Sequence, residues 1–268
     1  MKTNKWMVFL FLLVFCRCAN EINETQEKEC ECETIQYDEW TTISTCGTTT
    51  CFPAVSDKYK YPIVLGSEEW KQIKTSDEAY QVCQLPADIL KSISTPGLID
   101  ALIHAPMFIG FFYHSAGYAT VWNGYYETFN SSVELFKRKD AGKALVAYYK
   151  LINLNSLSAL NCEDWSSRLC GLECLFTREE ILDTMDHEKK KEAVAAFLEN
   201  VKIHSVYDHI YPMAHIMFAD QYEPVVKYLQ ENNNEYVHIF WTGSSCPLKS
   251  ELCAKIVTFA KDFINDKK

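Results

Sequence analysis

The segment from Gln84 to Ile152 places several short helix patterns in close succession, and this most constrains the fold. Pro86 and Pro96 are each placed to lie in the first turn of a helix. Proline is tolerated there, because the backbone N–H that it lacks would have no partner within the helix. Apolar residues at helical spacing follow each proline. Short helices with one apolar face must stack to bury that face. The sequence therefore predicts an all-α fold, either a helical bundle or an α-α superhelix of the HEAT or armadillo kind.

Polar residues at the expected helix starts refine this prediction. Ser67 and Ser76 can each begin a helix, and Thr95 can cap the one that starts at Pro96. Ser131 with Glu134 offers a capping box, and Asp140 can cap the next helix. The same signals predict a second capping box at Thr177–Glu180. They also predict three longer helices, which are Glu188–His204, Tyr207–Tyr222, broken or begun at Pro212, and Pro247–Asn265.

Part of this stretch reads LPADIL at Leu85–Leu90, STPGL at Ser94–Leu98 and LFKRKDA at Leu135–Ala141. These residues match the pattern LP-x-D-[VI]-L, S-T-x-G-L and L-x-x-R-x-D-A. The pattern resembles that of uncharacterised secreted or lipoprotein-type helical proteins of Bacteroidetes. The resemblance implies an exported helical protein and brings no activity and no catalytic residues.

The first 18 residues have the character of a secretory signal. Lys2 and Lys5 precede an unbroken apolar run from Trp6 to Phe15, and a basic start followed by an apolar run of about 7–15 residues defines such a signal. The run is shorter than the ~20 residues that a membrane-spanning helix needs. Cys18 is the expected lipidation site, with Cys16 as the alternative, although neither cysteine follows a small residue. We therefore expect a bacterial cell-envelope lipoprotein, held to the membrane by a lipid anchor, or a secreted protein.

The composition then divides the remaining chain. Residues 19–59 are acidic and rich in Thr and Cys, which indicates a tether and a loop-rich region outside the core. A small hairpin within Thr41–Thr50, closed by a Cys46–Cys51 bridge, fits its β-branched residues. Residues 60–268 are expected to form the helical domain.

Twelve cysteines in an exported chain favour disulfides. Plausible local bridges join Cys162 to Cys170 or Cys174, and Cys246 to Cys253. A zinc site at Cys170 and Cys174 is the alternative, but no second cysteine pair has the usual ligand spacing, and no cofactor is expected. The disulfide candidates are Cys30, Cys32, Cys46, Cys51, Cys162, Cys170, Cys174, Cys246 and Cys253.

Two further groups of residues could carry chemistry. His204, Asp208 and His215 would share one face of a continuous helix and could hold a metal or act as acid and base, but Pro212 interrupts the pattern. An aromatic set could line a ligand groove, such as a sugar platform, although core packing explains most of it. Its members are Tyr113, Tyr118, Trp122, Tyr125 and Tyr126.

The formal net charge of −10 argues against nucleic acid as a partner. The sequence also has no G-x-S-x-G elbow, no P-loop and no G-x-G-x-x-G. These observations favour a non-enzymatic binding or scaffold module for a protein or glycan partner. The alternative is a metal- or glycan-processing enzyme that uses the face formed by His204, Asp208 and His215.

Overall fold

In the computed structural model the chain is mostly helical, which confirms the predicted all-α class. The part of the chain that the structure describes contains twelve helices and three short strands. No helix in that part is long and apolar enough to cross a bilayer. The described residues are 33–39, 41–44, 52–108, 124, 126–152, 162–201, 206–233 and 250–267. Within these ranges, the backbone alone is described for residues 162–167 and 206–209.

The strands precede the helices in the chain. The strands β1, β2 and β3 form one antiparallel sheet in that order, and they span Thr34–Gln36, Thr42–Ser44 and Ala54–Val55. The helices are α1 Glu68–Lys71, α2 Ser76–Gln81, α3 Ala87–Ser92, α4 Thr95–Ile103, α6 Asn130–Leu135, α7 Ala141–Lys150, α8 Cys162–Leu175, α9 Glu179–Leu182, α10 His187–Val201, α11 Val206–Ala219, α12 Glu223–Glu231 and α14 Ser250–Ile264.

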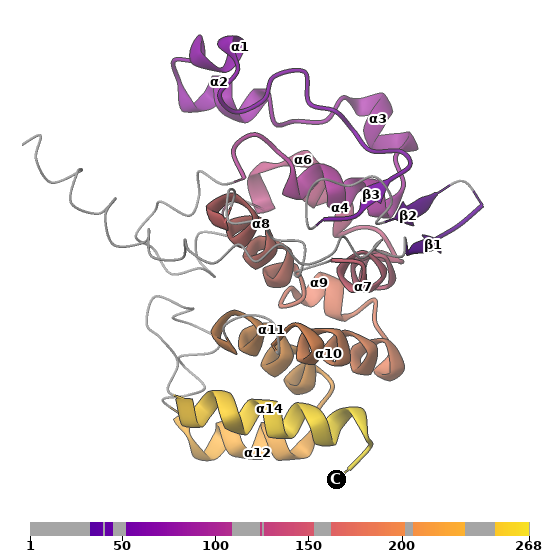
Figure 1. Cartoon of the computed structure of the whole chain (residues 1–268), viewed down its shortest axis with the longest axis vertical. Coiled ribbons are helices and arrows are strands. Elements are labelled where there is room, and N and C mark those ends of the chain that lie inside the picture. Colours follow the sequence, from indigo (N-terminus) through magenta and orange to yellow (C-terminus); the bar gives the residue numbers. More distant parts are fainter. Residues whose placement is uncertain are drawn as a thin grey trace, which may run out of the picture.

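The helices stack in layers along the long axis of the molecule (Figure 1). α4 packs on α6, α7 and α8. α7 then packs on α10 and α8 on α11, and both α10 and α11 pack on α14. α12 completes the last layer against α11 and α14. Each layer buries the apolar face of the one before it, as expected for stacked short helices.

α4 is the central helix, and all nine of its residues are buried. A helix that is apolar on every side can be stable only inside a core. Asp100 is its one charged residue. The guanidinium of Arg168, on α8, donates to the carbonyl of Ile103 at the end of α4, where helix carbonyls lack partners and attract positive charge.

The start of α4 differs from the prediction. Ser94, not Thr95, caps this helix, and its hydroxyl accepts a hydrogen bond of 3.0 Å from the N–H of Gly97. The carboxylate of Asp57 holds Ser94 by accepting from its N–H at 2.6 Å and from its hydroxyl at 2.9 Å. Thr95 is buried instead and donates to Oδ1 of Asp140 at 2.8 Å.

The predicted capping boxes also differ. α6 begins at Asn130 with Phe129 at the cap position, and Ser131 is buried within the helix, so no box forms with Glu134. Glu134 pairs with Arg138 at 2.9 Å instead. Asp140 does occupy the cap position of α7, but its carboxylate accepts no bond from that helix.

The second predicted box, at Thr177–Glu180, is likewise absent. Arg178 stands at the cap position of α9 and makes no side-chain cap bond. The hydroxyl of Thr177 donates to the carbonyl of Cys174 at 2.8 Å and is therefore already engaged with the end of α8.

Pro212 does not interrupt α11, which is continuous from Val206 to Ala219. Proline removes one backbone hydrogen bond and normally kinks or breaks a helix. Here α11 is held by contacts with α8, α10, α12 and α14, and Met213, Ala214 and Met217 are fully buried. Packing against four neighbours offsets the lost bond.

The segment predicted as a tether contributes to the core. Ile43, Phe52 and Val55 are at most 4 % exposed and belong to the main hydrophobic cluster. The correction has a simple cause: alternating residues of a strand point to one side, so even a Thr-rich segment can supply an apolar face. β2 pairs antiparallel with β3, which lies beyond Thr50, so this pairing is not contained in Thr41–Thr50 as predicted. Cys46 and Cys51, the predicted bridge, lie outside the described residues.

No disulfide joins the cysteines whose side chains the structure describes. Cys174 and Cys253 are free thiols, so the predicted bridges from Cys162 to Cys174 and from Cys246 to Cys253 are absent. Cys170 and Cys174 also belong to no group of side chains that could hold a metal, among the described residues. The other candidates lie outside the described side chains: Cys16, Cys18, Cys30, Cys32, Cys46, Cys51, Cys162 and Cys246.

Candidate functional site

Residues 62–82 leave the core and return to it, and we call this excursion the 62–82 arm. Its two ends meet at the buried ring of Tyr61, whose hydroxyl lies 3.4 Å from the carbonyl of Cys83 and donates to the carbonyl of Ala101 at 3.1 Å. Burial raises the pKa of the Tyr61 hydroxyl well above its ordinary value, so it stays a donor. The base of the arm is thereby tied directly to α4.

Asn130 fixes the returning end of the arm. Its side-chain amide donates to the carbonyl of Leu85 at 2.8 Å and accepts from the N–H of Leu85 at 2.9 Å. The N–H of Asn130 donates in turn to the side chain of Gln84 at 2.9 Å. Three hydrogen bonds between α6 and residues 84–85 give the arm a fixed exit from the core.

The arm itself is peripheral. α1 has no buried residue, and α2 buries only Ala79. Figure 1 shows both helices at one end of the molecule, beyond the stacked layers. Short excursions with a fixed base are common carriers of function, because a rigid scaffold positions them while the tip stays accessible.

The tip of the arm is apolar and exposed. Val64 is 53 % exposed and Leu65 is 51 % exposed, the highest values for large apolar residues in the described part of the chain. Gly66 follows with a φ of +85°, a left-handed conformation that favours glycine. The next residue, Ser67, caps α1 by accepting from the N–H of Trp70 at 3.1 Å. The turn is therefore held by its own backbone and by the helix that follows.

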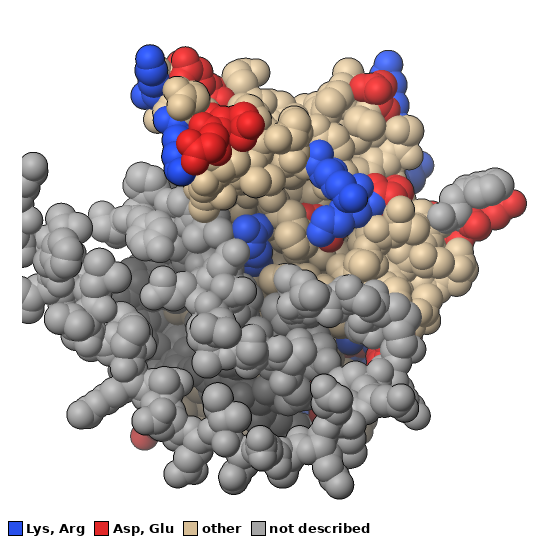
Figure 2. All heavy atoms as spheres, turned by 45° about the horizontal axis from the view of Figure 1, so that its top comes forward, with Lys and Arg blue, Asp and Glu red and all other residues tan. Residues whose placement is uncertain are grey.

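Charged residues of both signs border this tip. Glu68 and Glu69 are exposed in the first turn of α1, and Lys71 pairs with Glu68 at 2.6 Å. In Figure 2, acidic and basic side chains gather at the corner formed by α1 and α2, and an uncharged surface lies between that corner and α3. An apolar centre with a charged rim is the usual composition of a protein-binding surface.

The predicted aromatic groove is described at one residue only. Tyr126 is 1 % exposed, and its hydroxyl donates to the carbonyl of Gly171 at 2.5 Å. Its ring meets that of Phe136 edge to face at 5.9 Å. Tyr126 is thus a core residue and not part of a groove. The other members lie outside the described residues: Tyr113, Tyr118, Trp122 and Tyr125.

The predicted metal or acid–base face is described in part. Asp208 and His215 lie on the continuous helix α11, but the side chain of Asp208 and all of His204 are outside the described residues. His215 is half-buried on α11. Over the described residues, no group of three His, Cys, Asp or Glu side chains could hold a metal ion.

Asp100 forms a buried polar cluster that the sequence did not single out. Its carboxylate is fully buried, accepts from the hydroxyl of Tyr148 at 3.1 Å, and lies 3.6 Å from the ammonium of Lys58. His104 donates from Nδ1 to the main-chain carbonyl of Asp100 at 2.9 Å, and the same nitrogen lies 3.3 Å from the carboxylate. Burial raises the pKa of Asp100, but the hydrogen bond from His104 and the charges of His104 and Lys58 outweigh it and hold the pKa below its ordinary value. Tyr148 and His104 both meet Oδ1, whereas Oδ2 accepts no hydrogen bond from the described residues and is balanced only by the ammonium of Lys58.

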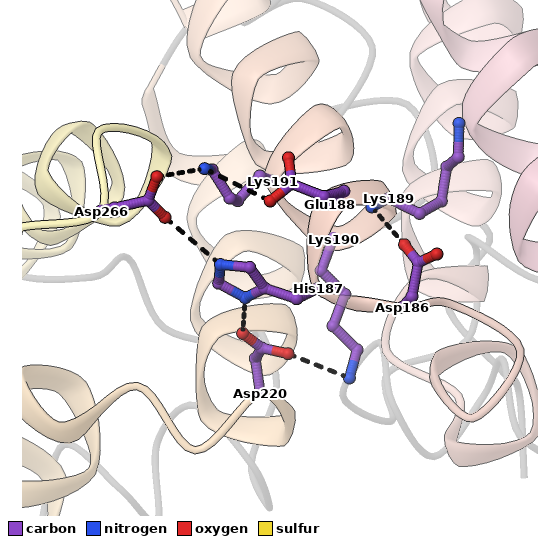
Figure 3. A network of polar contacts seen from close by, with 8 residues as sticks. All are labelled: Asp186, His187, Glu188, Lys189, Lys190, Lys191, Asp220 and Asp266. Carbon is purple, nitrogen blue, oxygen red and sulfur yellow. Dashed lines mark hydrogen bonds and ion pairs between the residues drawn. The ribbon is translucent and has the colours of Figure 1, made fainter.

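A second polar cluster lies on the surface where α10 meets the ends of α11 and α14. The imidazole of His187, at the start of α10, lies between Asp220, which follows α11, and Asp266, which follows α14 (Figure 3). Lys190 and Lys191 pair with the same two carboxylates. We call this group the His187 clasp.

No family model, no curated protein and no solved structure matches this chain. Among the side chains that the structure describes, the most exposed large apolar ones are Val64 and Leu65 at the tip of the 62–82 arm, and their signal in the sequence is this adjacent pair directly before a glycine.

Proposed function

We propose that this chain is an exported, non-enzymatic binding module that contacts a protein partner through the tip of the 62–82 arm. One observation carries the proposal: Val64 and Leu65 are both more than half exposed on a turn that is fixed at its base. Burying a fully exposed aliphatic side chain of this size contributes about 1.5–3 kcal/mol, and because Val64 and Leu65 are already about half covered, each would contribute about half of that. The rest of the interface must therefore supply further contacts around them.

The chemistry of the tip favours a protein over a glycan. Val64 and Leu65 offer neither an aromatic face nor a hydrogen-bonding side chain to a sugar. An apolar pocket in a protein would instead remove both from water, which is the main source of association free energy. The partner's rim would carry basic residues opposite Glu68 and Glu69, which are exposed beside the tip.

Export and anchoring belong to the same proposal. The basic start and the apolar run Trp6–Phe15 support a secretory signal, and Cys18, or alternatively Cys16, would carry the lipid. The protein would then act in the bacterial cell envelope, or be secreted if it is cleaved without lipidation. Disulfides among Cys30, Cys32, Cys46 and Cys51 fit that oxidising setting. Changing Cys18→Ser should release the protein from membranes, and unchanged retention would argue against an anchor at this residue.

The partner is tested by crosslinked affinity purification of the full-length protein from its native cells. The double variant Val64→Ser/Leu65→Ser should lose a stoichiometric protein that the unaltered chain recovers. Both side chains are exposed, so the fold should be retained, which a thermal melt of each purified variant checks.

Val133→Ser is the matched control, because Val133 is also apolar and 39 % exposed but lies on α6. Recovery should survive this change. Equal recovery with all three proteins, or no stoichiometric protein with any of them, would contradict the proposal.

A further inference from the structure

The His187 clasp joins three helices at one end of the stack. Nδ1 of His187 lies 2.6 Å from Oδ2 of Asp220, and Nε2 lies 3.3 Å from Oδ1 of Asp266. Figure 3 shows the ring between the two carboxylates, which come from the chain beyond α11 and beyond α14. The ring also rests edge to face on Phe263, in the last turn of α14, at 5.5 Å. One side chain of α10 thus holds the ends of two other helices.

The proton count of an imidazole makes this arrangement depend on protonation. Carboxylates only accept hydrogen bonds, and a neutral imidazole has one N–H, whereas the imidazolium has two. Both contacts of His187 can therefore be hydrogen bonds only when the ring is charged. We propose that the His187 clasp is a pH-responsive latch that closes the end of α14 onto α10 and α11 when His187 is protonated and loosens it when His187 is neutral.

The other charged groups around the ring keep the latch from being all-or-none. Lys190 lies 3.4 Å from Oδ1 of Asp220, and Lys191 lies 2.7 Å from Oδ2 of Asp266. These ammonium groups hold both carboxylates whatever the state of His187. Loss of the proton therefore removes one hydrogen bond and one charge from the latch, but not the lysine pairs.

The remaining titratable groups near His187 are acidic, and each already pairs with a lysine side chain or accepts a backbone hydrogen bond. Glu188 lies next to His187 and pairs with Lys191 at 3.7 Å. Asp262 pairs with Lys267 at 3.4 Å on the α14 side. Asp186 accepts from the N–H of Lys189 and so caps the start of α10. The acidic groups near the ring favour its charged form.

The direction of the pH effect follows from the contacts. The hydrogen bond to Asp220, partly opposed by desolvation, and the hydrogen bond to Asp266 raise the pKa of His187 above its ordinary value of about 6.5. A raised pKa in the folded chain means that the stabilisation is complete below the ordinary pKa and is lost as the pH rises through the raised value. The latch is therefore closed in mildly acidic conditions and loose in alkaline ones.

Two amides at the end of α14 report on the latch. The N–H of Asp266 donates to the carbonyl of Phe263, and the N–H of Lys267 donates to the carbonyl of Asp262 at 3.0 Å. Their hydrogen exchange, measured by NMR on the whole protein and corrected for the intrinsic rate at each pH, gives their protection. We expect protection to fall about two- to five-fold between pH 5.5 and pH 9, as for the loss of one partly exposed ion pair.

Two variants test the assignment. His187→Gln should abolish the pH dependence, because glutamine does not titrate. Lys191→Met should lower protection at every pH but keep the dependence, because His187 is still present. Constant protection in the unaltered protein, or the same pH dependence in His187→Gln, would overturn the proposal. This inference does not depend on the partner proposed above, since it is measured on the chain alone.

Discussion

The hydroxyl of Tyr37 donates a hydrogen bond of 2.8 Å to Oδ2 of Asp140, a residue 103 positions further along the chain. The other carboxylate oxygen of Asp140 accepts from the hydroxyl of Thr95 at 2.8 Å. One side chain at the start of α7 therefore joins the segment after β1 to the first turn of α4. The ring of Tyr37 also lies 4.9 Å from the ammonium of Lys143, which adds a cation–π contact to the same joint.

Removing this joint should destabilise the fold. Asp140→Ala leaves the hydroxyls of the half-buried Tyr37 and the buried Thr95 without this carboxylate acceptor, so we expect the free energy of unfolding to fall by about 2 kcal/mol or more. Tyr37→Phe removes one of the two bonds and should lower it by about 1 kcal/mol. Urea unfolding followed by circular dichroism measures both. Equal values for the two variants would mean that the bond from Thr95 contributes nothing.

Close packing at Gly142 gives a second prediction. A Cβ added there would lie 2.2 Å from Cγ of Met185 and 2.7 Å from Oγ1 of Thr184, and the N–H of Gly142 donates to that same hydroxyl at 2.8 Å. Gly142→Ala should therefore force α7 and α9 apart and lower the free energy of unfolding by about 1–3 kcal/mol. Thermal melts of the purified variants provide the measurement.

Gly124→Ala is the control for that change. Gly124 is helical, and a Cβ there would meet nothing within 4 Å. Alanine is favoured over glycine within a helix by up to about 1 kcal/mol. We expect this variant to be as stable as the unaltered chain or slightly more stable, and a loss like that of Gly142→Ala would show that the effect is not one of local crowding.

The buried charge of Asp100 predicts a response to acid. Its lowered pKa means that its stabilising contribution is complete above the ordinary pKa of about 3.9 and is lost as the pH falls through the lowered value. Lys58→Met removes one source of the lowered pKa, so acid unfolding should begin at a higher pH. At pH 7 we expect a loss of about 1–2 kcal/mol, because Lys58 is itself 38 % exposed.

A double-mutant cycle separates the ion pair from other effects of Lys58. In an Asp100→Asn background, where the charge is gone, Lys58→Met should have little effect on the free energy of unfolding. A similar loss in both backgrounds would assign the effect to the aliphatic stem of Lys58 and not to its charge.

Cys83 should be chemically inert in the folded protein. It is fully buried, and burial raises the pKa of its thiol to about 11, so about 0.1 % is thiolate at pH 8. Alkylation by iodoacetamide, located by mass spectrometry, should leave Cys83 unmodified at pH 8 and modify it readily in urea. Cys174, which is half-buried, should react faster in the folded state. Rapid labelling of Cys83 in the native chain would contradict its burial in the core.

Much of the helical content could be predicted because its signals are local. Ser67 caps α1, and α2 begins at Ser76, because the capping side chains and the bare N–H groups lie within four residues of one another. The stripe of Val194, Phe197 and Leu198 on α10 is buried as its spacing predicts. The amphipathic end of the chain likewise forms α14, with its apolar face inward.

The side-chain contacts between helices could not be predicted, because the residues that make them lie far apart in the sequence. The side chain of Gln84, 46 positions before Asn130, accepts from the first N–H of α6, and Ser131 is buried. Pro212 is tolerated because four helices support α11. Asp220 and Asp266 meet His187 only once α11 and α14 have stacked on α10.

The sequence by itself determined that the chain is helical and where most helices begin, since periodicity and caps act within one or two turns. Tertiary structure alone decided which polar groups became partners and which apolar groups stayed outside. Ile43, in a Thr-rich segment, is fully buried, whereas Val64 and Leu65 are half exposed. The physical reason is that burial depends on the surface that other layers of the stack present, and no local pattern encodes that surface.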